Sequence, residues 1–248
     1  MIRQGLRVAT YNVHGCIGLD RRYDPERVAA VLRELDADII GLQEVDNHRP
    51  LRRGLHQLEL LREATGMMAV PGLNISSKRG DYGNAILTKL PVGDVRRLDL
   101  SVPGYEPRGA LDVDLIGPEG RIRILSTHLG LRPAERRRQI AGILEALDPG
   151  PMPWPPTILL GDINEMMPSG GIPVRNITGR FASEYRGRSF PSLCPVFYLD
   201  RIFAHPRPER AVFKVHRSRL ARWASDHLPA IGEFTWNEAP NAVDRRMP

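Results

Sequence analysis

The feature that most constrains the fold is a recurring segment in which a short β-rich run ends in polar side chains. LRVATYNVHG (6–15) ends at Asn12 and His14, ADIIGLQEVD (37–46) ends at Gln43 and Glu44, and RIRILSTHLG (121–130) reaches His128. PTILLGDINEMM (156–167) runs into Gly161 and then presents Asp162 and Asn164. A Gly-Asp pair alone is an ordinary turn. Several strands that end this way favour a rigid scaffold that presents polar groups at one edge.

The segments between these runs contain hairpin and helix signals. RGALDVDLI (108–116) alternates apolar and polar residues, and GPEG joins it to the next run, which predicts a hairpin. Asp24 before Pro25 predicts a helix start, and Pro133 predicts another. The leucines at 55, 58 and 61 indicate a third helix. Hairpins mixed with helices predict a layered α/β sandwich with much antiparallel pairing rather than a doubly wound parallel sheet.

Composition sets broad limits on partners and compartment. The 248 residues allow one large domain or two small ones, and 42% apolar content permits a sizeable core. The net charge of +6 favours an anionic partner such as nucleic acid, a phospholipid surface or a phosphorylated small molecule, and it selects none of these. Two cysteines are too few for a disulfide framework. Because the sequence has neither a signal-peptide pattern nor a membrane-span pattern, we expect a cytoplasmic protein.

The polar strand ends are candidates for chemistry, although each has an ordinary structural interpretation. Asn12 and Asp162 can be turn formers, Glu44 a surface residue, and His128 a core histidine bonded to a carbonyl. WASDHLPAI near the C terminus adds Asp226 and His227 to the set. Their common position after strands, together with residue types that are used in hydrolysis, favours a functional site.

These residue types suit metal-assisted hydrolysis. Carboxylates such as Glu44 and Asp226 suit Mg²⁺ or Mn²⁺, whereas the absence of cysteine clusters and of an HExxH motif argues against zinc. A carboxylate at Asp162 can orient and deprotonate a water molecule. Asp226 cannot easily contact the adjacent His227 while it reaches a metal. The segment FYLDRIF (197–203) therefore supplies Asp200 as the partner of His227.

The ordered set of motifs resembles a known superfamily. TYNVHG, LQEVD, RGDYGNAILTK, STHLG, LLGDINE, FYLDRIF and ASDHLPA together resemble the endonuclease/exonuclease/phosphatase superfamily of metal-dependent, DNase I-like phosphoesterases, from Thr10 to about Pro229. The resemblance implies a four-layer sandwich of two mixed, largely antiparallel β-sheets packed face to face with helices outside. We expect this domain to span residues 1–236 and residues 237–248 to be a disordered tail.

The resemblance also implies a role for each candidate. Glu44 corresponds to the main metal ligand, Asn12 to its neighbour near metal and phosphate, and Asp226 to a further metal-side carboxylate. Asp162 corresponds to the water-orienting residue and Asn164 to an amide that binds phosphate or water. His128 and His227 correspond to histidines that contact the scissile phosphate, with Asp200 supporting His227. Arg108 and Asn84 correspond to substrate-side residues, although Arg108 also fits a solvated arginine at a strand start.

The sequence departs from the superfamily pattern in several places. His14 stands where apurinic endonucleases carry an aspartate, and their tyrosine-proline signature is missing, which counts against an abasic-site nuclease. The carboxylate partner of His128 has no clear counterpart. Asp81 is a candidate, but its position beside Gly80 favours a turn residue.

The sequence therefore predicts a single-domain, Mg²⁺-dependent enzyme that hydrolyses a phosphodiester by direct attack of water. A phospholipid-type or small phosphodiester is favoured as substrate, and a DNase I-like nuclease is the alternative. A catalytically silent module that recognises phosphate is the alternative from another class. The basic run RPAERRRQ (132–139) permits peripheral membrane contact, although a solvated helix face is the simpler interpretation. Neither the number of metal ions, the choice between diester and monoester, nor the oligomeric state follows from the sequence.

Overall fold

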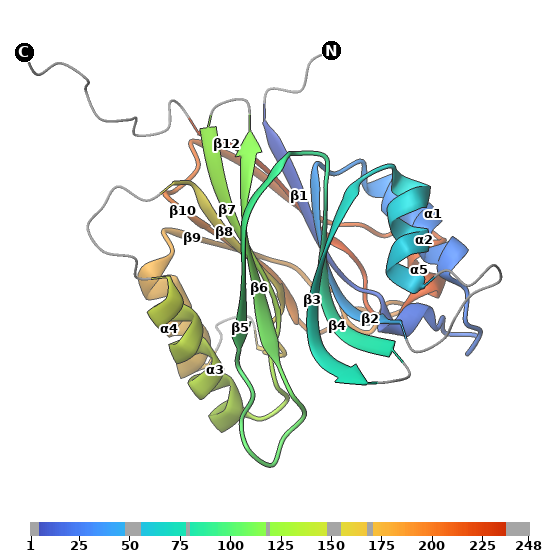
Figure 1. Ribbon diagram of the computed structural model, residues 1–248, viewed down its shortest axis with the longest axis horizontal. Coiled ribbons are helices and arrows are strands. Elements are labelled where there is room, and N and C mark those ends of the chain that lie inside the picture. Colours follow the sequence, from blue (N-terminus) through green and yellow to red (C-terminus); the bar gives the residue numbers. More distant parts are fainter. Residues whose placement is uncertain are drawn as a thin grey trace, which may run out of the picture.

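Two six-stranded β-sheets lie face to face at the centre of the molecule (Figure 1). The computed structural model describes residues 5–47, 56–77, 80–117, 120–147, 155–167 and 171–236. The expected tail, residues 237–248, lies outside the described residues. Both sheets are mixed, so the predicted sandwich is confirmed.

The first sheet has the strand order β11-β12-β1-β2-β4-β3. Its strands are β1 (Leu6–Asn12), β2 (Ile39–Asp46), β3 (Met68–Ser77), β4 (Gly80–Thr88), β11 (Arg210–Val215) and β12 (Ala230–Thr235). Only the pairing of β1 with β2 is parallel among these neighbouring strands. The carboxyl ends of β1 and β2 therefore meet at one edge of the sheet.

The second sheet has the order β5-β6-β7-β8-β10-β9. Its strands are β5 (Val92–Asp99), β6 (Gly109–Gly117), β7 (Gly120–His128), β8 (Thr157–Asp162), β9 (Ser183–Arg186) and β10 (Asp200–His205). The β6–β7 pairing is the predicted hairpin, and β7 runs parallel to β8. In both sheets, therefore, a central parallel pair delivers two strand ends to the same edge.

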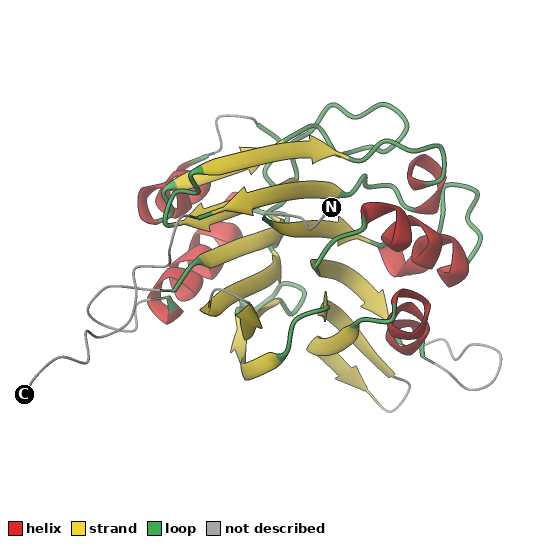
Figure 2. Cartoon of the chain, turned by 90° about the horizontal axis from the view of Figure 1, so that it is seen from above, coloured by secondary structure: helices red, strands yellow, loops and turns green. Residues whose placement is uncertain are grey.

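Helices cover the outer faces of both sheets (Figures 1 and 2). The first sheet carries α1 (Pro25–Leu35), α2 (Gln57–Thr65) and α5 (Ala221–Ala224), and the second carries α3 (Pro133–Ala146) and α4 (Ile172–Arg180). A short 3₁₀ turn, η1 (His14–Cys16), follows β1. Asp24 caps α1 by accepting a hydrogen bond from the Arg27 amide at 3.0 Å, as predicted. Leu58 and Leu61 lie in α2, whereas Leu55 lies outside the described residues.

Three apolar layers hold the four structural layers together. Between the sheets, side chains such as Ile39 and Ile86 pack with Leu111, Ile124 and Leu160. The other two layers lie between each sheet and its helices. None of the helices in the described part of the chain combines the length and apolarity that a membrane crossing requires. Cys16 is buried and Cys194 is exposed, and both are free thiols.

Candidate active site

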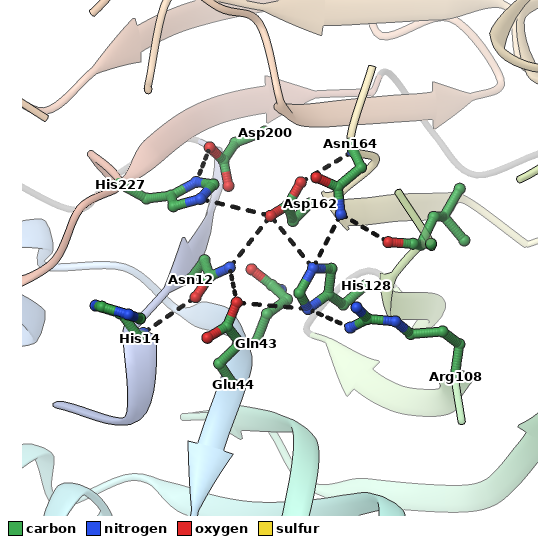
Figure 3. A network of polar contacts seen from close by, with 12 residues as sticks. Asn12, His14, Gln43, Glu44, Arg108, His128, Asp162, Asn164, Asp200 and His227 are labelled. Atoms are coloured by element: carbon green, nitrogen blue, oxygen red, sulfur yellow. Dashed lines mark hydrogen bonds and ion pairs between the residues drawn. The ribbon is translucent and has the colours of Figure 1, made fainter. Parts of the chain in front are cut away.

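The candidate active site lies where the ends of the central strands of both sheets meet (Figure 3). Asn12 is the last residue of β1, and it pairs in register with Gln43 of β2. His128 ends β7 and pairs with Asp162 at the end of β8. Asp200, the first residue of β10, pairs with Asp162 from the other side. Backbone pairing therefore aligns the site residues within each sheet, and the hydrogen bond from the Asn12 side chain to Asp162 joins the two sheets at this edge.

Glu44 owes its orientation to an irregularity in β2. The pairing of β2 with β4 shifts register between Leu42 and Val45, and Glu44 has a left-handed backbone with φ of 58°. Bulges of this kind redirect a side chain, and strained non-glycine residues cluster at functional sites. Glu44 accepts a hydrogen bond from the Asn12 amide nitrogen at 2.8 Å, whereas the buried Gln43 contacts Thr10 and Ser126. The bulge therefore separates a structural amide from a carboxylate that faces the site.

Gly161 makes it possible for Asp162 to reach the centre of the site. Its φ of 151° and its close approach to β7 exclude a side chain, because a Cβ there would lie 1.9 Å from the Thr127 carbonyl oxygen. The sequence pattern Leu-Leu-Gly-Asp is thus a buried strand that passes tightly against its neighbour before it presents a carboxylate. Asp162 is 1% exposed.

One oxygen of Asp162, Oδ2, lies close to three other side chains of the site. Oδ2 accepts a hydrogen bond from Asn12 Nδ2 at 3.1 Å and lies 3.5 Å from His128 Nε2 and 3.6 Å from His227 Nε2. The other oxygen accepts a hydrogen bond from the Asn164 amide at 2.9 Å. The Asn164 side chain donates to the Leu129 carbonyl at 2.7 Å, and its nitrogen lies 3.1 Å from His128 Nε2. Asp162 is therefore held in one orientation while both histidines face it.

His227 pairs with a buried carboxylate. Its Nδ1 lies 2.9 Å from Asp200 Oδ2, which also accepts a hydrogen bond from Ser189 Oγ at 2.5 Å. Burial lowers the pKa of His227, but the charges of Asp200 and Asp162 and the hydrogen bond to Asp200 outweigh burial and raise this pKa to about 10. His227 is therefore an imidazolium at neutral pH, and its Nδ1–H donates to Asp200.

His128 has a cation as its partner. Its Nδ1 lies 2.9 Å from Arg108 Nη1. Because a guanidinium only donates, Nδ1 accepts and the ring carries its proton on Nε2, which faces the Asp162 carboxylate, while the Asn164 nitrogen beside it donates to the Leu129 carbonyl instead. Burial lowers the pKa of His128, the Asp162 carboxylate opposes this effect, and the positive charges of Arg108 and His227 lower the pKa further, to about 4. His128 is therefore neutral at pH 7. Its Nδ1 contacts Arg108 at hydrogen-bond distance, and the carboxylate beside this nitrogen is Glu44, whose Oε1 lies 4.0 Å away.

The remaining candidates, Asn84 and Asp226, lie around this centre together with Tyr82 of β4. Asn84 is buried in β4 and donates to the Gly109 carbonyl at 3.0 Å, so it contacts the strand start that follows Arg108. Tyr82 donates a hydrogen bond to Glu44, and burial and the Glu44 carboxylate raise its pKa, so the phenol stays neutral. Asp226 lies on the opposite side, 3.7 Å from His14 Nδ1.

The comparison with known families decides the classification. Residues 9–227 match the Endonuclease/Exonuclease/phosphatase family. The chain belongs to this family. The uncharacterized protein YbhP from Escherichia coli strain K12 is 30% identical to it over 244 residues, which cover 92% of this chain and 95% of YbhP. The chain is accordingly a phosphoesterase of this superfamily.

Two solved structures share the fold. A functionally unknown conserved protein from Enterococcus faecalis V583 has a TM-score of 0.75 at 20% identity, covering 94% of this chain and 100% of that one. The endonuclease/exonuclease/phosphatase from Beutenbergia cavernae has a TM-score of 0.73 at 21% identity, covering 97% of this chain and 74% of that one. The predicted DNase I-like fold is therefore confirmed.

The family implies a divalent cation, and two groups of residues are chemically able to hold one. Asp162, Asp200 and His227 offer ligand atoms within 4.8 Å of one another, which is compatible with a metal site. His227 would have to lose a proton to serve as a ligand there, because its Nδ1 faces Asp200 and only a deprotonated Nε2 offers a lone pair. Glu44 Oε1 and Asp162 Oδ2 instead converge on one amide group of Asn12, at 2.8 and 3.1 Å. Carboxylate oxygens are the ligands that a hard cation prefers, and these two lie close to one another.

Sequence reasoning missed the residues that hold the histidines in place. Ser189 contacts Asp200, and Ser225 Oγ donates to the Asn12 carbonyl at 2.8 Å and accepts from the His227 amide at 3.2 Å. Ser225 therefore joins β1 to the segment that carries His227. Its position beside Asp226 and His227 is a signal that sequence inspection could use, whereas Ser189 has no distinctive sequence context.

Proposed function

We propose that this protein is a metal-dependent phosphodiesterase that cleaves its substrate by direct, in-line attack of water. The observation that carries the proposal is the position of Asp162 Oδ2 between two histidines, one neutral and one protonated. Such an arrangement provides a base for water beside two donors for phosphate oxygens.

Asp162 acts as the residue that orients water and accepts its proton. It is ionisable, buried and fixed by the Asn164 amide, so it faces the reacting centre in one rotamer. A fixed carboxylate within hydrogen-bond distance of water contributes to the rate by general base catalysis. Because Asp162 is the attacking water's partner and no nucleophilic side chain is needed, the reaction proceeds without a covalent enzyme intermediate.

The two histidines stabilise negative charge in different ways. His227, as an imidazolium, offers a full positive charge to the phosphoryl oxygens and a proton to the leaving group. His128, as a neutral ring, donates a hydrogen bond from Nε2, and Arg108 behind it adds positive charge. Asn12 and Asn164 supply amide contacts on the remaining sides.

Glu44 is the proposed main ligand of Mg²⁺ or Mn²⁺, with Asn12 beside it and Asp226 on the far side. When bound, the cation polarises a phosphoryl oxygen and offsets the charge that develops during attack. The proposed substrate is a phospholipid-type or small phosphodiester. Asn84, which contacts the strand start after Arg108, supports the substrate side of the site.

The proposal is tested by hydrolysis of bis-p-nitrophenyl phosphate and p-nitrophenyl phosphate with Mg²⁺, with Mn²⁺ and with EDTA. We expect diester hydrolysis that EDTA abolishes and that Asp162→Asn lowers by about a thousandfold. Asp94→Asn is the matched control, because Asp94 is an exposed aspartate on β5, and we expect it to act as wild type. A protein that is inert on every phosphoester would be a silent binding module. Efficient nicking of supercoiled plasmid without phospholipid headgroup release would identify a nuclease instead.

A further inference from the structure

We infer that the surface beside the candidate active site, at the edge where its strands end and here called the mouth, carries on one side a docking surface for an anionic phospholipid bilayer. The inference rests on the proposed function, because it names the surface from which this phosphoesterase would take a lipid-type substrate. The surface, called the apolar rim, consists of Leu131, Met166, Met167, Leu193, Val196 and Trp223.

The exposed apolar residues of this protein are unevenly distributed. Ten large apolar side chains of the described residues are strongly exposed, and six of them form the apolar rim, with exposures from 44% at Trp223 to 71% at Leu131. Isolated exposed apolar residues are normal on soluble proteins, but a group of them marks a surface that binds something.

The segments that carry the rim contact one another in sequence around the mouth. Arg136 donates to the Leu131 carbonyl at 2.8 Å and to Glu165 at 3.2 Å, which joins Leu131 to the segment before Met166. The Tyr198 amide lies 3.5 Å from the Met166 carbonyl, so the segment with Val196 comes next.

The apolar rim continues to α5 and remains close to the candidate active site. Arg222 donates to the Leu193 carbonyl at 3.0 Å, which places α5, the helix that carries Trp223, next to the segment with Leu193. The Phe190 ring lies 4.8 Å from the His227 ring, centroid to centroid. At the other end, Asn164 contacts His128 only two residues before Met166. Hydrogen bonds therefore link the segments that carry the rim, and these segments border both histidines.

Within the segments that carry the rim, the exposed charges have one sign. In residues 131–138, 164–167, 188–198 and 217–224, the exposed charged side chains are all arginines, namely Arg132, Arg137, Arg138, Arg188, Arg217 and Arg219. The only acidic side chains in these segments, Glu135 and Glu165, are buried. Apolar side chains that enter the headgroup region, surrounded by cations that pair with lipid phosphates, are what an anionic membrane surface attracts.

Duplex DNA fits this surface less well. Its backbone offers phosphates to the arginines, but exposed leucine, methionine and valine side chains find no apolar counterpart along a phosphate backbone. A bilayer satisfies both the arginines and the apolar side chains. The observations therefore favour a lipid surface over a nucleic acid.

The experiment is co-sedimentation of the full chain with vesicles of pure phosphatidylcholine and of equimolar phosphatidylcholine and phosphatidylglycerol. We expect binding to the anionic vesicles, weaker binding to the neutral ones, and weakening by salt. Met166→Ser/Met167→Ser and Leu193→Ser/Val196→Ser should each lower anionic-vesicle affinity about tenfold. The matched control is Ile116→Ser/Val212→Ser, which removes apolar side chains that are 49% and 47% exposed on β6 and β11 and should bind as wild type.

Hydrolysis of soluble bis-p-nitrophenyl phosphate by the same preparations separates this inference from the proposed function. Rim variants should keep the wild-type rate and the wild-type thermal unfolding temperature. If the protein binds vesicles but hydrolyses no phosphoester, the docking surface stands and the proposed function is wrong. Absence of vesicle binding, equal loss in the control variant, or tighter binding to duplex DNA than to anionic vesicles would overturn the rim and leave the function standing.

Discussion

His128 and His227 occupy similar positions, but their pKa values are shifted in opposite directions. Each is 5% exposed, and each places Nε2 about the same distance from one oxygen of Asp162, 3.5 and 3.6 Å. The second nitrogen of His128 faces Arg108, whereas that of His227 faces Asp200. Because burial is the same, the charge of the partner decides the protonation state. The protonation state of each histidine is therefore set by the residue that contacts its second ring nitrogen, which is Arg108 for His128 and Asp200 for His227.

The largest effect on the difference in protonation between the two histidines is expected from Asp200→Asn. The amide removes the charge that keeps His227 protonated, so the pKa of His227 should fall and the diesterase rate should drop by about a thousandfold. The pH profile of kcat/KM should show its alkaline limb at lower pH than in wild type.

The matched comparison for Asp200→Asn is His227→Gln. The two variants should be similarly slow, since both remove the imidazolium. Asp200→Asn with a wild-type rate and an unmoved alkaline limb would mean that the carboxylate is only structural.

A smaller effect is expected on the other side of Asp162. Arg108→Met removes a cation that lowers the pKa of His128, so this pKa should rise from about 4, and the rate should fall roughly tenfold to a hundredfold. Arg108→Lys should restore part of the activity, because it returns the charge without the fork geometry. Histidine titration by NMR gives the pKa, and a value unchanged in Arg108→Met would contradict the assigned cause.

The two histidines should also affect stability in opposite pH ranges. His227 has a raised pKa, so its stabilising contribution is complete below pH 6.5, its ordinary pKa, and is lost as the pH rises through about 10. His128 has a lowered pKa, so its contribution is complete above about pH 6.5 and is lost as the pH falls towards about 4.

Urea unfolding of the metal-free protein across this pH range measures both effects. His227→Gln should remove the loss of stability at alkaline pH and keep the loss at acidic pH. His128→Gln should remove the loss at acidic pH and keep the loss at alkaline pH. Identical pH dependence in the two variants would contradict the distinction between the histidines.

The smallest expected effect concerns Ser189. Ser189→Ala removes one hydrogen bond to Asp200 Oδ2, worth about 1 kcal/mol, so the rate should fall about fivefold while His227 keeps most of its raised pKa. The measurement is kcat/KM at neutral pH. A loss as large as that of Asp200→Asn would show that the serine, rather than the histidine contact, holds the carboxylate.

Much of this arrangement could be predicted from the sequence, because strand ends can be recognised locally. Apolar runs that end in Asn12, His128 and Asp162 indicated that sheets present these residues at an edge. Asp200 was inferred because the neighbour of His227 is geometrically unsuited to serve it. A layered α/β sandwich followed from hairpin signals mixed with helix signals, and its four layers followed from the resemblance to the superfamily.

The rest depends on contacts between distant segments. Arg108 is 20 residues from His128, and a local pattern cannot show that its guanidinium lies on the imidazole. The bulge that turns Glu44 towards the site arises from the pairing of β2 with β4. The apolar rim could not be predicted either, because residues such as Met166 and Leu193 have the composition of core positions and become a surface only when their segments align around the mouth.

The central claim is that one buried carboxylate, Asp162, lies between a charged and a neutral histidine. Long-range ¹H–¹⁵N NMR of the ¹⁵N-histidine-labelled, metal-free protein at pH 7 tests it most directly, with His128→Gln and His227→Gln identifying the two rings among the seven histidines. The account predicts two protonated nitrogens in His227 and a single proton, on Nε2, in His128. Two neutral rings, or a charged His128, would contradict it.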